Sequence, residues 1–117
     1  MLIAEICEIL EADSLDDVKS FDKEINVVCG SDLMSDVLTF VKSDSLLLTG
    51  LVNPQVVRTA EMAEIAAICF VRGKRPQEET IKLANEKKIP LLITKLFMYE
   101  SCGRLYTEGL PGGYDSK

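Results

Sequence analysis

Apolar residues along the chain follow two patterns, one typical of helices and one typical of strands. Residues 2–10 place apolar side chains at helical spacing opposite an acidic face, which predicts an amphipathic helix. Alternation at residues 25–29 and continuous apolar runs at 45–49, 66–71 and 89–93 predict four strands. Continuous runs are typical of strands that are buried on both faces of a parallel sheet. The acidic, weakly patterned stretch 12–24 predicts a loop with a short strand near Ser14 and Leu15.

Each predicted strand is followed by a segment with helical spacing. The predicted helices span residues 31–42, 54–64, 76–88 and 94–107. Ser31 or Asp32, Asn53 and Thr94 are small polar residues of the kind that cap helix N-termini, and Pro54 suits a first helical position. The expected inward stripe of the helix 31–42 is Leu33, Val37, Phe40 and Val41.

The order of these elements, a helix and then strand and helix four times over, predicts the fold class. Such alternation indicates an α/β fold, a three-layer α/β/α arrangement around a mostly parallel sheet of four to five strands. The 117 residues of the chain are the size of one ordinary domain. We assign residues 1–110 to that domain and expect the Gly- and Pro-containing residues 111–117 to form a flexible tail.

Composition narrows the classes of partner. The formal net charge of -6 argues against nucleic acid and against an anionic membrane surface, because phosphate binding needs clustered Lys and Arg. No apolar run reaches the ~18 residues that a membrane span needs. The start of the chain carries early acidic residues and no basic segment, unlike a signal peptide. We therefore expect a soluble, cytoplasmic protein.

Residues that commonly support catalysis are scarce. The chain has no His, which removes the commonest general base and metal ligand. Cys7, Cys29, Cys69 and Cys102 lie in apolar stretches without C-x-x-C spacing, so we expect buried, reduced thiols and no metal site. Neither G-x-x-x-x-G-K-[ST] nor G-x-G-x-x-G occurs. The sequence therefore predicts a non-enzymatic protein that carries no cofactor.

Small, hydroxyl-bearing and cationic residues follow the predicted strands. In open parallel sheets, ligands bind beyond the carboxyl ends of the strands, where helix N-termini offer backbone N–H groups. The candidate ligand-binding residues are Ser31, Asp32, Thr49, Gly50, Asn53, Arg72, Gly73, Lys74 and Thr94. Their chemistry suits a small anion such as a nucleotide or another phosphorylated metabolite. The alternative is structural, because caps and glycine turns occur in any α/β domain.

Several stretches resemble small stand-alone proteins of the DRTGG-domain family. They are SDLMSDVL at 31–38, LLTGLVNPQVVRTAEM at 47–62, FVRGK at 70–74, and the strand IPLL at 89–92 with a Thr after it. The likeness covers nearly the whole chain. It implies an α/β/α domain that tends to form homodimers. Related domains occur in phosphotransacetylases, beside CBS modules in regulated pyrophosphatases and in similar form at the front of HPr kinases, where they are regulatory or architectural.

The chain departs from the name-giving motif at two places. Where the family has Gly-Asp-Arg after the second strand, residues 52–55 read VNPQ, and where it has Thr-Gly-Gly after the third strand, residues 71–74 read VRGK. A ligand role of the usual Asp and Arg would therefore have to be taken over here by Asn53 and Arg72.

Two functions follow from these observations. The first is a non-catalytic regulatory domain that senses a small anionic ligand at the strand ends and acts through homodimer or protein-partner contacts. The second is a purely structural dimerisation or protein-interaction module, suggested by surplus apolar positions in the helices 31–42 and 94–107. Proteins that this chain resembles are often encoded near hydrogenase-type redox genes, which implies an accessory role in a redox system.

Overall fold

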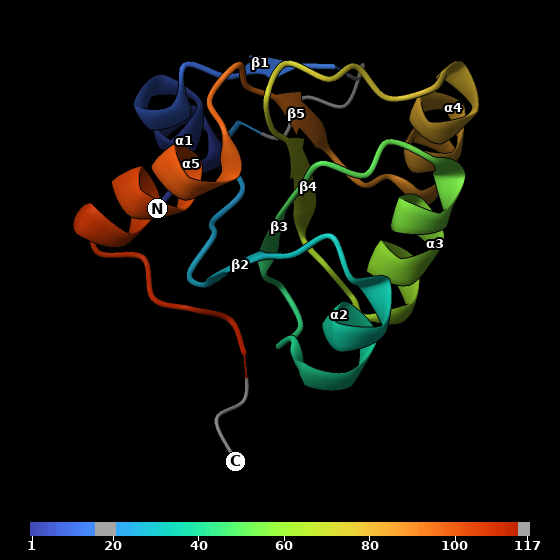
Figure 1. The fold of residues 1–117 in the computed structure, drawn as a ribbon, viewed down its shortest axis with the longest axis horizontal. Coiled ribbons are helices and arrows are strands. Elements are labelled where there is room, and N and C mark those ends of the chain that lie inside the picture. The colour runs from blue at the N-terminus through green and yellow to red at the C-terminus, as the bar shows by residue number, and fades with distance from the viewer. Residues whose placement is uncertain (16–20, 115–117) are drawn as a thin grey trace.

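The computed structural model describes residues 1–15 and 21–114, which form one five-stranded sheet and five helices (Figure 1). The strands are β1 (Asp13–Ser14), β2 (Val28–Gly30), β3 (Leu46–Thr49), β4 (Ala67–Phe70) and β5 (Leu91–Ile93). The helices are α1 (Ile3–Leu10), α2 (Met34–Phe40), α3 (Pro54–Met62), α4 (Glu78–Lys87) and α5 (Met98–Thr107). The strand order is β1-β5-β4-β3-β2, with β2 to β5 parallel and β1 antiparallel to β5. The predicted α/β fold with a mostly parallel sheet is confirmed.

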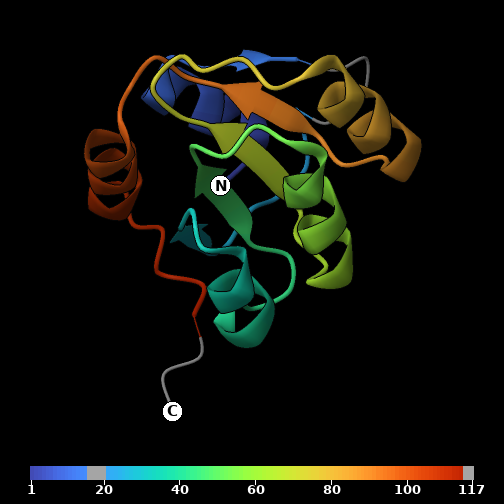
Figure 2. The ribbon, with the colours of Figure 1, turned by 45° about the vertical axis from the view of Figure 1, so that its right-hand side comes forward.

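Helices cover both faces of the sheet. Successive parallel strands are direct neighbours, so the helices α2, α3 and α4 that connect them lie on the same face. Figures 1 and 2 show these three helices on one side and α1 with α5 on the other. No helix in the described part of the chain is long and apolar enough to cross a membrane. The arrangement confirms the predicted three layers.

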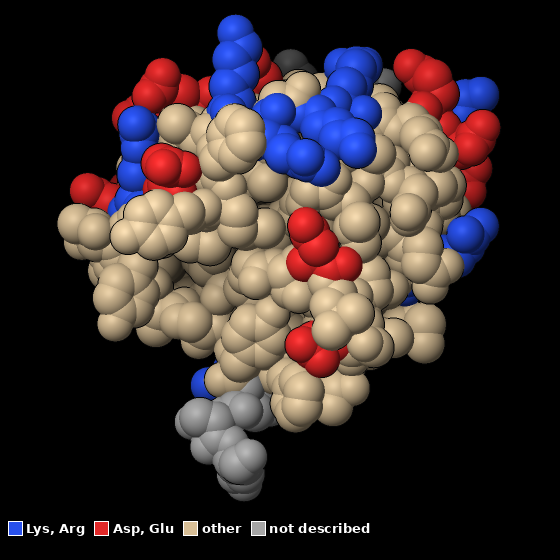
Figure 3. Space-filling view, viewed as in Figure 1, with Lys and Arg blue, Asp and Glu red and all other residues tan. Residues whose placement is uncertain are grey.

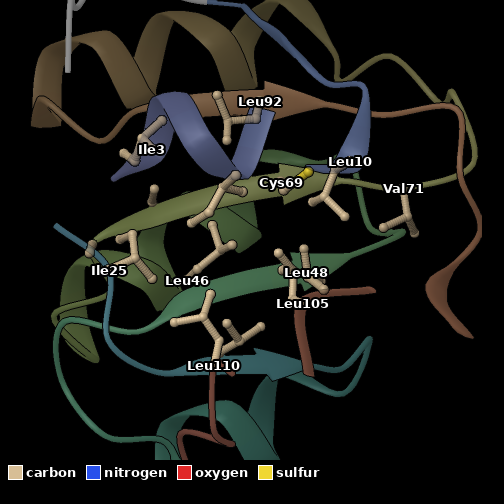
Figure 4. Packing of buried hydrophobic residues seen from close by; sticks show 14 residues of the cluster. Ile3, Leu10, Ile25, Leu46, Leu48, Cys69, Val71, Leu92, Leu105 and Leu110 are labelled. Carbon is tan, nitrogen blue, oxygen red and sulfur yellow. The ribbon is translucent and has the colours of Figure 1, made fainter. Parts of the chain in front are cut away.

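The sheet separates two clusters of buried side chains. In β3, Leu46 and Leu48 belong to the cluster beneath α1 and α5, whereas Leu47 belongs to the cluster beneath α2, α3 and α4. Figure 4 shows the first cluster, where Ile3 and Leu10 of α1 approach the strands from one side and Leu105 of α5 packs beside them. Because strand side chains alternate between faces, a continuous apolar run fills both clusters at once.

The predicted pattern of α2 is wrong in part. The helix begins at Met34 with Leu33 as its N-cap, and neither Ser31 nor Asp32 caps it. Within the expected inward stripe only Val37 is buried, while Leu33 is 57% and Phe40 47% exposed. A helix of seven residues makes two turns, so it can turn few positions toward the sheet. The apolar residues left over lie on the surface.

Two segments near the chain ends differ from expectation. The strand predicted at 25–29 is shorter in the structure, where β2 begins at Val28 and Ile25 N donates to Met1 O at 2.7 Å. Gly113 N donates to Val28 O at 2.7 Å and Val28 N to Pro111 O at 3.0 Å, so residues 111–113 pair with the start of β2, and Tyr114 forms a bridge with Val41. The other predicted tail residues, 115–117, and part of the predicted loop, 16–20, lie outside the described residues.

Candidate ligand-binding edge

The carboxyl ends of the four parallel strands lie side by side at one edge of the sheet, since β2, β3, β4 and β5 are neighbours in that order. The sequence-predicted residues all fall at this edge. Ser31 and Asp32 follow β2, Thr49 and Gly50 end β3, the Arg72–Lys74 turn follows β4, and Thr94 follows β5. Asn53 lies directly before α3. The structure therefore puts these residues at one edge, but it gives them different local roles.

Asp32 joins the ends of two neighbouring strands. Its Oδ1 accepts hydrogen bonds from Thr49 Oγ1 at 3.0 Å and from Gly50 N at 2.7 Å. Thr49 Oγ1 in turn accepts from Leu51 N at 3.2 Å. Hydrogen bonds to a charged acceptor are stronger than neutral ones. This bridge holds the β2 and β3 ends together, and Asp32 remains exposed.

Arg72 reaches the same point from the other side. A Cβ placed on Gly50 would lie 3.3 Å from Arg72 Nε and 3.5 Å from Asp32 Oδ2. The guanidinium group and the carboxylate thus both close over the backbone of Gly50, where a side chain would crowd them. Gly50 is the predicted site residue whose lack of a side chain matters most directly to this arrangement.

The turn after β4 is locked to the loop after β5. Arg72 and Gly73 both have positive φ angles, 54° and 65°. Arg72 N donates to Leu96 O at 2.7 Å and Gly73 N to Thr94 O at 2.8 Å. Because these N–H groups already have partners, an anion at this turn would be held by side chains rather than by the backbone.

A group of exposed cations lies on these two loops. Arg72, Lys74 and Arg75 are exposed on the first loop and Lys95 on the second, with Lys95 Cγ 3.8 Å from a Cβ placed on Gly73. Figure 3 shows Lys and Arg side chains gathered at the upper rim of this face, above acidic side chains near its middle. Lys95 and Arg75 are not among the predicted site residues, although Lys95 directly follows Thr94 and Arg75 directly follows Lys74 in the sequence.

Three predicted site residues have structural roles in the fold. Ser31 Oγ accepts from Leu33 N at 3.0 Å in the turn before α2. Asn53 Oδ1 accepts from Gln55 N at 3.1 Å, which confirms Asn53 as the N-cap of α3. Thr94 is 1% exposed, and its Oγ1 donates to Leu10 O at 2.6 Å and accepts from Leu96 N at 3.2 Å. The prediction that Thr94 caps the last helix is wrong, because α5 begins at Met98 with Phe97 as its N-cap.

We expect Thr94→Val to lower the free energy of unfolding by about 2 kcal/mol, because Leu10 O and Leu96 N would lose their buried partner. Urea unfolding of the purified variant measures the loss. Thr39→Val is the matched control, since Thr39 is exposed and its hydroxyl only donates back to Ser35 O within α2. An equal loss in both variants would contradict the structural role of Thr94.

A hollow of the surface lies away from the strand ends. A groove of about 840 Å³ follows α5 and is bounded by the Pro111–Gly112 segment, Val28 and Gly30. Sequence reasoning did not find this groove, because residues 111–114 were expected to be loose rather than paired with β2. The one signal of the groove in the sequence is Gly103, an unfavourable residue within the helical pattern 94–107 that lines the groove.

The thiols add no reactive centre. All four cysteines are free, and burial raises the pKa of each thiol. For Cys29 burial, and after it the neighbouring Cys102 thiol, raise the pKa to about 12. Within residues 1–15 and 21–114, no three Cys, Asp or Glu side chains gather so that they could hold a metal ion.

Comparisons with known proteins agree with this architecture. The family model for the DRTGG domain matches residues 5–106. No curated protein matches the chain. A similar solved structure is that of the CBS and DRTGG domains of the regulatory region of Clostridium perfringens pyrophosphatase, complexed with the activator diadenosine tetraphosphate. The TM-score is 0.68 at 16% sequence identity, over 91% of this chain and 46% of that one. The chain thus spans about half of that structure, and the likeness shows the fold.

Proposed function

The chain belongs to the DRTGG domain family, and on this premise we propose that it is a non-catalytic regulatory domain that binds a small anionic ligand at the carboxyl edge of its strands. In this proposal the ligand is a nucleotide or another phosphorylated metabolite, and binding acts through contacts with a second copy or with a partner protein. The observation that carries the proposal is the group of cations on the loops after β4 and β5, in a chain of net charge -6.

The geometry of the edge supports a ligand with mixed chemistry. Arg72 and Asp32 close over Gly50 from two sides, so a cation and a carboxylate stand beside each other. A bare inorganic anion would be repelled by Asp32. A nucleotide carries phosphate oxygens for Arg72 and Lys74 and also hydroxyl and amino donors for a carboxylate, so it suits this pairing better.

The regulatory part of the proposal is supported by the family and by one relative. In the Clostridium perfringens protein the DRTGG domain is part of a regulatory region whose activator is a nucleotide. We extend that setting to this chain as a proposal, because the identity of 16% shows a shared fold and not a shared ligand site.

Thermal unfolding with a panel of ligands tests the proposal. The panel holds ATP, ADP, AMP and diadenosine tetraphosphate, with inorganic phosphate and sulfate as bare anions. A ligand present at about 100 times its dissociation constant adds roughly 2.7 kcal/mol to stability, which raises Tm by several degrees in a domain of this size. We expect a shift with a nucleotide and none with sulfate. A panel without any shift would contradict ligand binding.

We expect Arg72→Ala combined with Lys74→Ala to weaken nucleotide binding roughly 100-fold, since each lost charged contact is worth about 1.5 kcal/mol. Titration calorimetry of the ligand that shifts Tm measures the change. The matched control is Arg58→Ala combined with Lys82→Ala, which removes two exposed cations from α3 and α4 away from the strand ends. Unchanged affinity in the Arg72 variant would place the ligand elsewhere.

A second candidate function is a purely structural dimerisation or protein-interaction module, accessory to a redox system. The exposed apolar side chains of α2 and α5 favour it, for example Leu38, 43% exposed, and Phe97, 63% exposed. The two candidates differ in the ligand panel, because only the regulatory domain requires a shift in Tm.

A further inference from the structure

Phe97 directly precedes α5 and leaves its ring in solvent. The side chain is 63% exposed. Its neighbours Leu96 and Met98 both turn inward, where they pack against the cluster beneath α1 and α5. The backbone of Phe97 is extended, with φ -77° and ψ 170°, and in extended backbone successive side chains point to opposite sides. The two neighbours therefore anchor the loop, while the aromatic ring points away from the core.

The N-cap position that Phe97 occupies favours a different kind of residue. Ser, Thr, Asp and Asn are preferred there, because their side chains accept hydrogen bonds from the first backbone N–H groups of the helix. Phe97 makes no such hydrogen bond, although its backbone has the extended conformation of a capping residue. Glu100 already stands at the third helical position, so a Ser or Thr in place of Phe97 would complete a capping box. A residue that contributes neither burial nor a cap is typical of a functional position.

Phe97 lies at the carboxyl edge of the sheet, between two contacts that fix its loop there. On one side, Leu96 O accepts from Arg72 N at 2.7 Å. On the other side, Met98 Sδ lies 3.0 Å from a Cβ placed on Gly30, the last residue of β2. Figures 1 and 2 show the loops after β4 and β5 side by side at this edge. The exposed ring therefore belongs to the same edge as the group of cations.

The cations nearest to Phe97 come from both loops. Lys95 is exposed and stands two residues before Phe97, so their Cα atoms lie at most about 7 Å apart. Arg72, also exposed, is joined through its backbone to Leu96, the residue next to Phe97. An aromatic group stacked on Phe97 and an anionic group held by Lys95 and Arg72 would therefore be neighbouring parts of one small ligand.

We propose that Phe97 is the platform on which the base of a nucleotide stacks, while Arg72, Lys74 and Lys95 hold its phosphates. This inference rests on the proposed function and narrows its ligand from any phosphorylated metabolite to one that carries an aromatic base. Stacking on an aromatic side chain tolerates every base, because each base has a π face. The ring therefore selects the class of nucleotides and not one member of the class.

Titration calorimetry of the full chain with ATP, GTP and tripolyphosphate tests the proposal, because tripolyphosphate carries phosphates without a base. We expect the wild type to bind at least one of the two nucleotides roughly 10- to 100-fold more tightly than tripolyphosphate. Phe97→Ala should remove most of this difference by weakening the binding of the nucleotide alone. Phe40→Ala is the matched control, since Phe40 is 47% exposed and is the last residue of α2, a helix length away from the strand ends.

Phe97→Ser separates a binding role from a structural one. This substitution supplies the missing cap and completes the capping box with Glu100, so we expect Tm to rise by a few degrees. The affinity for the nucleotide should fall as it does in Phe97→Ala. A residue with a structural role alone would lose stability on substitution and leave the affinity as it is. A lower Tm together with an unchanged nucleotide affinity would therefore overturn the proposal.

Phe97→Trp reports on the base directly. The chain contains no Trp, so the tryptophan fluorescence of this variant comes from position 97 alone. We expect the nucleotide to bind about as tightly as to the wild type and to quench this fluorescence, and we expect tripolyphosphate to leave it unchanged. In the control Phe40→Trp the nucleotide should not quench. Equal quenching in the two variants would contradict stacking on Phe97.

The results separate this inference from the proposed function. Nucleotides and tripolyphosphate that bind equally tightly to the wild type, with affinities unchanged in Phe97→Ala, would overturn the stacking role of the ring and leave the anion-binding edge in place. A wild type that binds none of these ligands would overturn both the ligand edge and the role of Phe97.

Discussion

Replacing Phe70 by alanine is expected to lower the free energy of unfolding by about 3–5 kcal/mol, the range for truncating a buried aromatic side chain. Phe70 is fully buried at the end of β4 and belongs to the cluster beneath α2, α3 and α4. The loss has two parts. The variant forfeits the favourable free energy of moving the ring from water into the core, and it leaves a cavity that neighbouring side chains fill only in part. Because a whole domain is stable by about 5–15 kcal/mol, this single change approaches global unfolding.

Urea unfolding followed by circular dichroism measures the loss at low protein concentration, where self-association does not contribute. Phe97→Ala is the control, since Phe97 is 63% exposed and its truncation should change stability by about 0.5 kcal/mol or less. Phe70 lies two residues before Arg72 in the sequence, and its backbone carbonyl accepts a hydrogen bond from Thr94 N at 2.9 Å. A Phe70→Ala loss below about 1 kcal/mol would mean that the cluster is packed far more loosely than the structure shows.

The middle of the sheet could be predicted from sequence because the strands β3 and β4 are fully buried. Residues 46–49 and 67–70 are buried at every position, so the apolar runs carry the information directly. The glycines and small polar residues after each run indicate where the strand ends and the chain becomes exposed to solvent. A mostly parallel sheet with helices on both faces then follows from the alternation of elements.

The details that could not be predicted depend on contacts between distant residues. The sequence predicts Ser31 or Asp32 as the cap of α2, but the carboxylate of Asp32 accepts instead from Thr49 and Gly50, 17 and 18 residues away. Thr94 was expected to cap a helix, but its hydroxyl donates to Leu10 O, 84 residues away. A local pattern identifies residues that can donate or accept, and only the folded chain decides between the nearby and the distant partner.

The common location of the candidate residues at one edge of the sheet could be predicted, and ligand binding there stays a prediction. The carboxyl edge follows from topology, and the structure brings Asp32, Thr49, Gly50 and Arg72 together there. The groove along α5 could not be predicted, because it exists only where the Pro111–Gly112 segment returns to β2. The position of the groove depends on the pairing of Gly112 with Val28, which the Gly- and Pro-rich sequence of this segment does not predict.

The second large effect is expected at alkaline pH, where the buried thiols should destabilise the fold. A thiol in an unfolded chain has a pKa of about 8.5, whereas burial raises the pKa of Cys29 to about 12 and that of Cys69 further, since Cys69 is fully buried. Between these values the unfolded chain has lost the proton and the folded chain still holds it. The unfolded state then binds fewer protons, so stability falls as pH rises, by about 1.4 kcal/mol per pH unit for each thiol.

Urea unfolding at pH 8.5, 9.5 and 10.5 measures this slope, which should reach about 2.7 kcal/mol per pH unit for the two thiols together. Cys29→Ala combined with Cys69→Ala should be less stable at pH 7, because buried volume is lost, and should nevertheless show a much flatter slope. The half-buried pair provides the control, since Cys7→Ala combined with Cys102→Ala should change the slope less. Lysine and tyrosine titrations are common to all these variants, so the difference in slope belongs to the thiols. Equal slopes in wild type and in the Cys29 and Cys69 variant would show that these thiols reach solvent before the chain unfolds.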